Sequence, residues 1–150
     1  YEQAQTLLQR YSHVRLVWSA NDEMAFGAMQ AAQELGKRAG TDLYFSALNN
    51  SEEVLRARMA GQVCVLVGGH FTLGGWAMVL LHDYHAGQDF AVRGGKDQIA
   101  PVFSLLDAEQ SARLSTRLQV PGYDLDFRRF SALYQPRMRA YRFSITPLLQ

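Results

Sequence analysis

Five polar side chains directly follow three short apolar runs of this 150-residue chain, and they are the residues best placed to do chemistry. Asn21 and Asp22 follow the first run, Asn49 and Asn50 the second, and His70 the third. Amide, carboxylate and imidazole groups offer donors and acceptors in planar geometry, which suits a ligand that carries several hydroxyl groups. We expect these five residues to contact such a ligand. For the Asn and Asp residues, capping of the helices that follow is the alternative.

The apolar run that precedes Asn21 ends in an aromatic residue, Trp18. An indole at this position could stack against the same ligand, and we include Trp18 among the predicted contacts. The alternative is a core position, because aromatic residues of parallel strands are commonly buried against helices.

Other constellations favour binding over catalysis. His82 and His85 share a helix face, as metal ligands must, but no third ligand follows at a defined spacing, so surface histidines are the simpler interpretation. Ser19 and Ser46 have no His and acid at a recognisable spacing. The single cysteine, Cys64, lies in an apolar run and is expected to be a small buried residue. We therefore predict no enzyme activity, no metal and no cofactor.

Three strand–helix units must position these residues. A β-branched run followed at once by a three- and four-residue apolar periodicity is typical of half a βαβ unit. The sequence predicts an α/β fold with a three-layer parallel sheet and helices on both faces. Right-handed crossovers would bring the three strand ends to one edge, where ligands bind in open α/β sheets. The predicted strands are Val14–Trp18, Leu43–Leu48 and Val63–Val67, and the helices begin at Asp22, Glu52 and Phe71.

The last third of the chain has a different pattern. We predict a further strand over Pro101–Leu106 and helices over Ala108–Leu118, Phe127–Tyr134 and Met138–Tyr141. Five arginines near the end are expected to form a solvated helix face, with a phosphate-binding patch as the alternative. Fifteen basic against fourteen acidic residues leave no field to recruit nucleic acid, and none is expected as a partner.

One segment carries a family resemblance. Trp18-Ser-Ala-Asn-Asp-Glu-Met-Ala-Phe-Gly-Ala28 resembles the type 1 periplasmic binding proteins, which are sugar-binding proteins related to the LacI-type repressors. Phe45-Ser-Ala-Leu-Asn-Asn50 falls where that family has a strand ending in a sugar contact, and Ala60-Gly-Gln-Val63 where a glycine precedes the third strand. The resemblance matches Asn21 to a ligand-contacting Asn. It places Asn49 where the family has a sugar-binding Asp, and Gly69-His70 where members often carry a Gln or other polar contact, for which His70 would substitute.

The resemblance also implies a domain organisation. Family members have two α/β lobes that clamp a ligand between them. Residues 1–70 would form most of the C-terminal lobe, 71–106 a segment crossing to the N-terminal lobe, and 107–150 a C-terminal helical tail. The chain would then be the C-terminal half of such a protein. The apolar helix from Phe71 would be exposed, so we expect the isolated chain to self-associate.

Function and location follow from the same resemblance as expectations. It implies a periplasmic solute-binding protein that holds a sugar or similar small polar ligand for ABC-type uptake or chemosensing. A membrane permease or receptor would be its partner, and a signal peptide would lie upstream of this segment. The alternative is the effector-binding domain of a LacI-type transcription regulator.

Overall fold

The three apolar runs form strands and the periodic segments form helices, as predicted. The computed structural model describes residues 1–150 and shows an α/β fold. Single 3₁₀ turns lie at His70–Thr72, Phe90–Val92, Pro121–Asp124, Phe127–Phe130 and Thr146–Leu148. The helices and strands are α1 (Glu2–Arg10), β1 (Leu16–Val17), α2 (Asp22–Glu34), β2 (Tyr44–Leu48), α3 (Glu52–Met59), β3 (Val65–Gly68), α4 (Leu73–His85), β4 (Ser104–Leu106) and α5 (Ala108–Leu118). No helix is both long and apolar enough to cross a lipid bilayer.

Side-chain caps start the helices of the sheet region. The Asn21 side chain accepts a hydrogen bond from the Met24 amide at 2.8 Å, which satisfies one of the free donors at the start of α2. Ser51 caps α3 by accepting from the Val54 amide at 3.2 Å. Asp107 caps α5 in a capping box. Of the Asn and Asp residues for which capping was the alternative, Asn21 alone caps a helix, and Ser51 rather than Asn50 caps α3.

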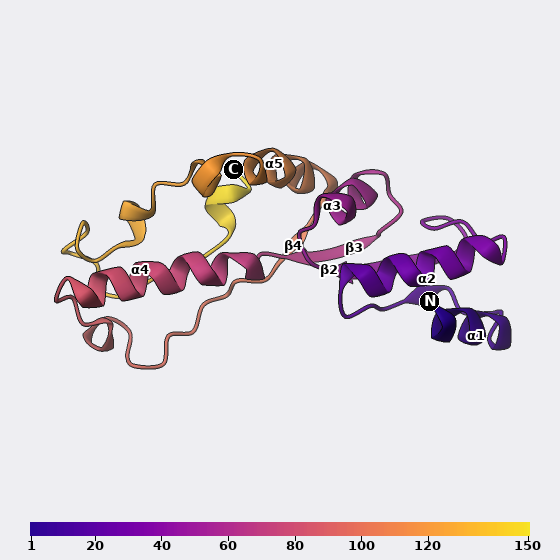
Figure 1. Ribbon diagram of the computed structural model, residues 1–150, viewed down its shortest axis with the longest axis horizontal. Coiled ribbons are helices and arrows are strands. Elements are labelled where there is room, and N and C mark those ends of the chain that lie inside the picture. The colour runs from indigo at the N-terminus through magenta and orange to yellow at the C-terminus, as the bar shows by residue number, and fades with distance from the viewer.

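The sheet has the order β1-β2-β3-β4 and is mixed. β1, β2 and β3 are parallel, but β4 is antiparallel to β3, with Ser104 opposite Gly68. The prediction of an all-parallel sheet is thus wrong at the fourth strand. The reason is geometric: α4 extends away from the sheet beyond the end of β3, so the returning chain meets β3 from its carboxyl end (Figure 1).

Helices cover both faces of this sheet. In Figure 1, α1 and α2 lie on one side and α3 and α5 on the other, which confirms the expected three layers. The core is made of buried apolar side chains such as Phe45 of β2, Leu66 of β3, Leu55 of α3 and Leu114 of α5. Together, the layers hold the strands in register and hence the ends of β1, β2 and β3 side by side.

The end of the chain is less helical than predicted. The helix expected over Phe127–Tyr134 is reduced to one 3₁₀ turn, and Met138–Tyr141 is not helical. A long-range contact explains this, because Asp83 of α4 accepts hydrogen bonds from the Ser131 hydroxyl, the Ala132 amide and the Tyr141 hydroxyl. The Ala132 amide thus makes a tertiary bond in place of a helical one, and the two hydroxyl bonds hold the segment against α4.

This terminal segment covers one side of α4. Trp76 and Val79 are buried beneath it, so the expectation that the whole apolar surface of α4 is exposed is wrong for these two residues. Leu73, Met78 and Leu81 remain more than half exposed, as expected. The exposed apolar face of α4 is therefore narrower than the sequence predicted.

Candidate functional site

The three strand–helix junctions are joined by hydrogen bonds. Asn49 Nδ2 donates to Asp22 Oδ1 at 3.0 Å, and Ser51 Oγ donates to Asp22 Oδ2 at 2.5 Å. Asn50 Oδ1 accepts from the Gly69 amide at 2.8 Å. The convergence of junctions predicted from the βα pattern is confirmed. We call Asn21, Asp22, Asn49, Asn50 and His70 the junction cluster.

Asp22 organises the cluster. Only 2% of its surface is exposed, and burial alone would raise the pKa of its carboxyl. Hydrogen bonds from Ser51, Asn49 and the Glu23 amide outweigh burial and hold that pKa below its usual range. Asp22 is therefore a carboxylate at neutral pH whose oxygens are already occupied by protein donors.

Asn50 holds the second junction against the third. It is buried, and its Nδ2 has no hydrogen-bond partner in the protein. A Cβ at Gly68 would overlap the Asn50 side chain, and one at Gly69, where φ is +114°, would overlap the Val102 carbonyl. The two glycines are thus required by close approach, which accounts for a pair that matches no phosphate-loop pattern.

Asn21 and Asn49 are the most accessible amides of the cluster. Asn21 is exposed, and its cap uses only the oxygen, so Nδ2 points to no protein acceptor. Asn49 is half-buried and has a φ of +155°, a backbone conformation that few non-glycine residues adopt. Its Oδ1 accepts from the Asn50 amide at 2.8 Å. Asp22, Asn49 and Asn50 thus bond across junctions, whereas the Asn21 and His70 side chains do not.

Aromatic side chains lie on both sides of the polar side chains of the junction cluster. Trp18 follows β1 and is 76% exposed, so it is not the core residue that was its alternative. Phe103 precedes β4 at the same edge, is 54% exposed, and lies 5.7 Å from the His70 ring between centroids. The His70 Nδ1 is buried and has no protein partner. Across the sheet, the edge therefore presents an aromatic ring, two amides, an imidazole and a second aromatic ring.

Phe103 was missed in the sequence, because its place depends on the antiparallel direction of β4. A parallel fourth strand would put this residue at the opposite edge of the sheet. The only local signal was its position next to the Ser104–Leu106 run.

The other candidate positions do not form a second chemical site. His82 lies 3.4 Å from the Asp83 carboxylate and stacks on Tyr134, with ring centroids 6.1 Å apart. No group of three or more His, Cys, Asp or Glu side chains lies in position to hold a metal ion. Cys64 is half-buried, and its thiol contacts the Phe45 carbonyl oxygen at 3.1 Å.

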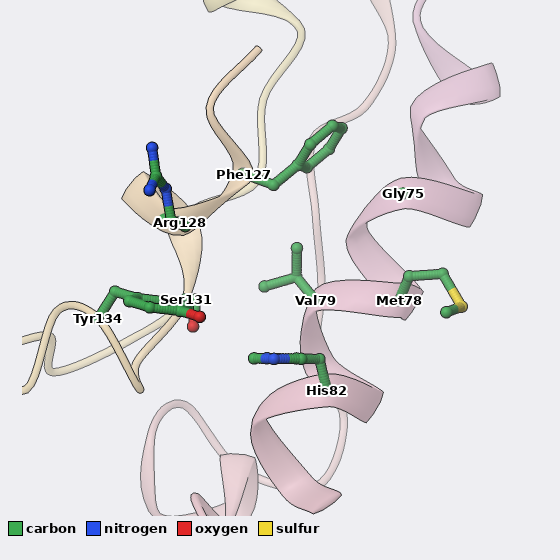
Figure 2. Close-up of a pocket in the computed structure, with 8 residues that line it drawn as sticks. All are labelled: Gly75, Met78, Val79, His82, Phe127, Arg128, Ser131 and Tyr134. Atoms are coloured by element: carbon green, nitrogen blue, oxygen red, sulfur yellow. The ribbon is translucent and has the colours of Figure 1, made fainter. Parts of the chain in front are cut away.

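A separate hollow of about 390 Å³ lies between α4 and the 3₁₀ turn at Phe127–Phe130 (Figure 2). Met78, Val79 and His82 line it from the helix, and Phe127, Arg128 and Tyr134 from the turn and the chain that follows. It contains no residue of the junction cluster. We place the candidate site at the sheet edge because the linked junctions are there, together with the unpartnered Asn50 Nδ2 and His70 Nδ1.

The sheet, its crossovers and the polar side chains at the strand ends define an α/β domain with a candidate ligand site at one sheet edge. Over its whole length the chain is 49% identical to a periplasmic sugar-binding protein from Pseudomonas fluorescens, with a TM-score of 0.93, and it spans 46% of that protein. It is 27% identical to the binding protein component of the arabinose ABC transporter from Shewanella sp. ANA-3, with 83% of this chain and 41% of that one covered and a TM-score of 0.61. A galactofuranose-binding protein shares the fold at 18% identity, with 79% of this chain and 40% of that one covered and a TM-score of 0.65.

No family model and no protein of curated function matches the sequence. The structural similarities nevertheless agree with the sequence resemblance to the type 1 periplasmic binding proteins. The chain spans less than half the length of these relatives. The LacI-type alternative finds no support among them.

Proposed function

We propose that the protein carrying this chain is a periplasmic sugar-binding protein and that the junction cluster forms one wall of its ligand site. The observation that carries the proposal is the row of polar groups between Trp18 and Phe103 at a single sheet edge. The 49% identity to a periplasmic sugar-binding protein supports both the ligand class and the location.

The geometry suits a sugar in two respects. The faces of Trp18 and Phe103 can cover the C–H surfaces of a sugar ring, while amide and imidazole groups between them pair with its hydroxyls. The Asp22 carboxylate holds Asn49 in place before ligand arrives. Less side-chain freedom is then lost on binding, which favours affinity.

The candidate site is accessible to solvent, because Trp18, Asn21 and Phe103 are exposed. An open edge is what one half of a clamp presents, and the rest of the longer protein would supply the opposing wall. Ligand bridging both walls would favour a closed form, which a membrane permease or receptor would then recognise. As in its relatives, binding is the proposed activity, and no reaction is assigned to the chain.

A sugar titration with matched variants tests the proposal. The full-length protein is titrated calorimetrically with a panel of pentoses and hexoses, as wild type and as Trp18→Ala, Phe103→Ala and Tyr84→Ala. Tyr84 is an aromatic residue on α4 whose exposure lies between those of Phe103 and Trp18, and it is outside the proposed site. We expect one sugar class to bind, both site variants to weaken it at least ~10-fold (about 1.4 kcal/mol) and Tyr84→Ala to leave it unchanged. Absence of sugar binding, or equal loss in all three variants, would overturn the proposal.

A further inference from the structure

Charge is unevenly distributed along this nearly neutral chain. All fourteen acidic residues lie at or before Asp126, whereas five of the fifteen basic residues follow it. Residues 127–150, which we call the basic tail segment, therefore carry +5, and residues 1–126 carry −4. Such asymmetry points to a partner of opposite charge for the basic part.

Three of these arginines converge. Arg129, Arg139 and Arg142 line a hollow of about 420 Å³ whose remaining lining is Phe130, Met138 and Ala140. The expected solvated helix face is not formed, because the segment has only the 3₁₀ turn Phe127–Phe130 around Arg129 and is irregular around Arg139 and Arg142. Convergence of the side chains comes instead from the irregular path of the backbone.

None of the three arginines forms an ion pair or a side-chain hydrogen bond within the chain, although Arg129 lies near the Asp126 carboxylate that Arg128 engages. Every ion pair in the structure involves other residues, including Arg128, which pairs with Asp126 at 2.8 Å. A guanidinium presents a planar set of donors that matches a carboxylate in two-point contact. Three such groups around one hollow thus form a surface of hydrogen-bond donors that could bind carboxylates.

The backbone beneath them is held in place. Asp83 binds Ser131, Ala132 and Tyr141, and Arg93 donates to the Met138 carbonyl. Phe130 packs on Trp76 at 5.0 Å between ring centroids. The arginines therefore extend from an anchored backbone, which lowers the entropic cost of engaging a partner.

We propose that this hollow docks an acidic segment of a partner protein, whose carboxylates pair with Arg129, Arg139 and Arg142 while an apolar side chain contacts Phe130 and Met138. A single inorganic anion is a poor fit, because exposed ion pairs are individually weak and the hollow is far larger than such an ion. A lipid surface is a poor fit because the arginines surround a concavity. The surface shares no residue with the junction cluster, so the proposal is independent of sugar binding.

Fluorescence anisotropy of the full-length protein with labelled peptides tests this docking surface. The probes are a peptide of repeated Glu-Glu-Leu units and its counterpart with Gln in place of Glu. The test variant is Arg129→Gln with Arg139→Gln and Arg142→Gln. The control is Arg10→Gln with Arg15→Gln and Lys96→Gln, three exposed cations outside the hollow whose removal changes net charge equally.

We expect the acidic peptide to bind, the Gln counterpart not to bind, and affinity to fall as salt rises to about 150 mM. The test variant should weaken binding ~10-fold or more, and the control should retain it. Four outcomes would each overturn the proposal: no peptide binding, equal loss in the control, displacement of the peptide by millimolar inorganic phosphate, or binding only to phosphatidylglycerol vesicles.

Discussion

The Nδ2 group of Asn49 donates to the Oδ1 atom of Asp22 across 3.0 Å, which joins the end of β2 to the start of α2. Because Asp22 also accepts from Ser51, one buried carboxylate fixes the geometry of two neighbouring strand ends. The proposed ligand wall thus depends on a residue that need not touch the ligand. The predictions below separate residues that hold the wall from residues that form it.

Asn21 has two separable roles. Asn21→Ala removes both the cap and the amide, so it should lower the free energy of unfolding by about 1 kcal/mol and weaken sugar binding by ~1–3 kcal/mol. Asn21→Ser keeps a capping oxygen and removes only the amide, so stability should be retained while affinity still falls. Chemical denaturation and calorimetry measure the two effects. Unchanged affinity in both variants would make Asn21 a structural residue alone.

Asp22 should act mainly on stability and pH dependence. Asp22→Ala leaves the Ser51 hydroxyl and the Asn49 amide without their acceptor and should cost about 2–4 kcal/mol. Its folded pKa lies below the unfolded one, so the stabilisation is complete above about pH 4 and is lost as the pH falls through the lowered folded value. Urea denaturation of wild type and variant across this range should show the difference between them shrinking in acid. A difference independent of pH would contradict the assignment.

Asp83 anchors the basic tail segment to α4. Burial would raise the pKa of its carboxyl, but hydrogen bonds from Ser131, Tyr141 and Ala132 lower it below the usual range. We expect Asp83→Asn to cost about 3 kcal/mol and Tyr141→Phe about 1–2 kcal/mol, because a bond to a charged acceptor is lost in each. Limited proteolysis should cut the tail faster in both. Tyr134→Phe, whose hydroxyl makes no hydrogen bond in the protein, is the control and should behave as wild type.

The isolated 150-residue chain should self-associate through α4. Leu73, Met78 and Leu81 leave an apolar stripe in water, and such surfaces are satisfied by contact with another copy. Sedimentation velocity should show dimers or larger species, which Met78→Lys with Leu81→Lys would convert to monomers. Val92→Lys with Ile99→Lys adds the same charge at exposed apolar positions outside the helix and should change nothing. A wild-type chain that remains monomeric would refute this prediction.

Local signals in the sequence were sufficient for much of the fold. Asn21, Ser51 and Asp107 mark helix starts through short-range bonds, and the apolar runs have strand length, so three strand–helix units could be predicted. The direction of β4 could not, because it depends on how far α4 carries the chain from the sheet. For the same reason, the place of Phe103 at this sheet edge could not be predicted.

The tail was mispredicted for a related reason. Periodicity alone favoured helix over Phe127–Tyr134, whereas Asp83, distant in sequence, holds this segment in an irregular path. The available signal was Asp83 itself, which lies on the same helix face as the apolar Trp76 and Val79. A charged residue on an apolar face indicates that the helix contacts a polar partner there. The polar residues at the strand ends were identified, but their bonds to one another become visible only in three dimensions.

The central claim is that sugar binds at the strand edge formed by the junction cluster. A crystal structure of the full-length protein with its sugar tests this most directly. We predict sugar oxygens within ~3 Å of Asn21 or His70 side-chain nitrogens, with a ring face against Trp18 or Phe103. A sugar bound elsewhere, for example in the hollow between α4 and Phe127–Phe130, with this edge empty, would contradict the account.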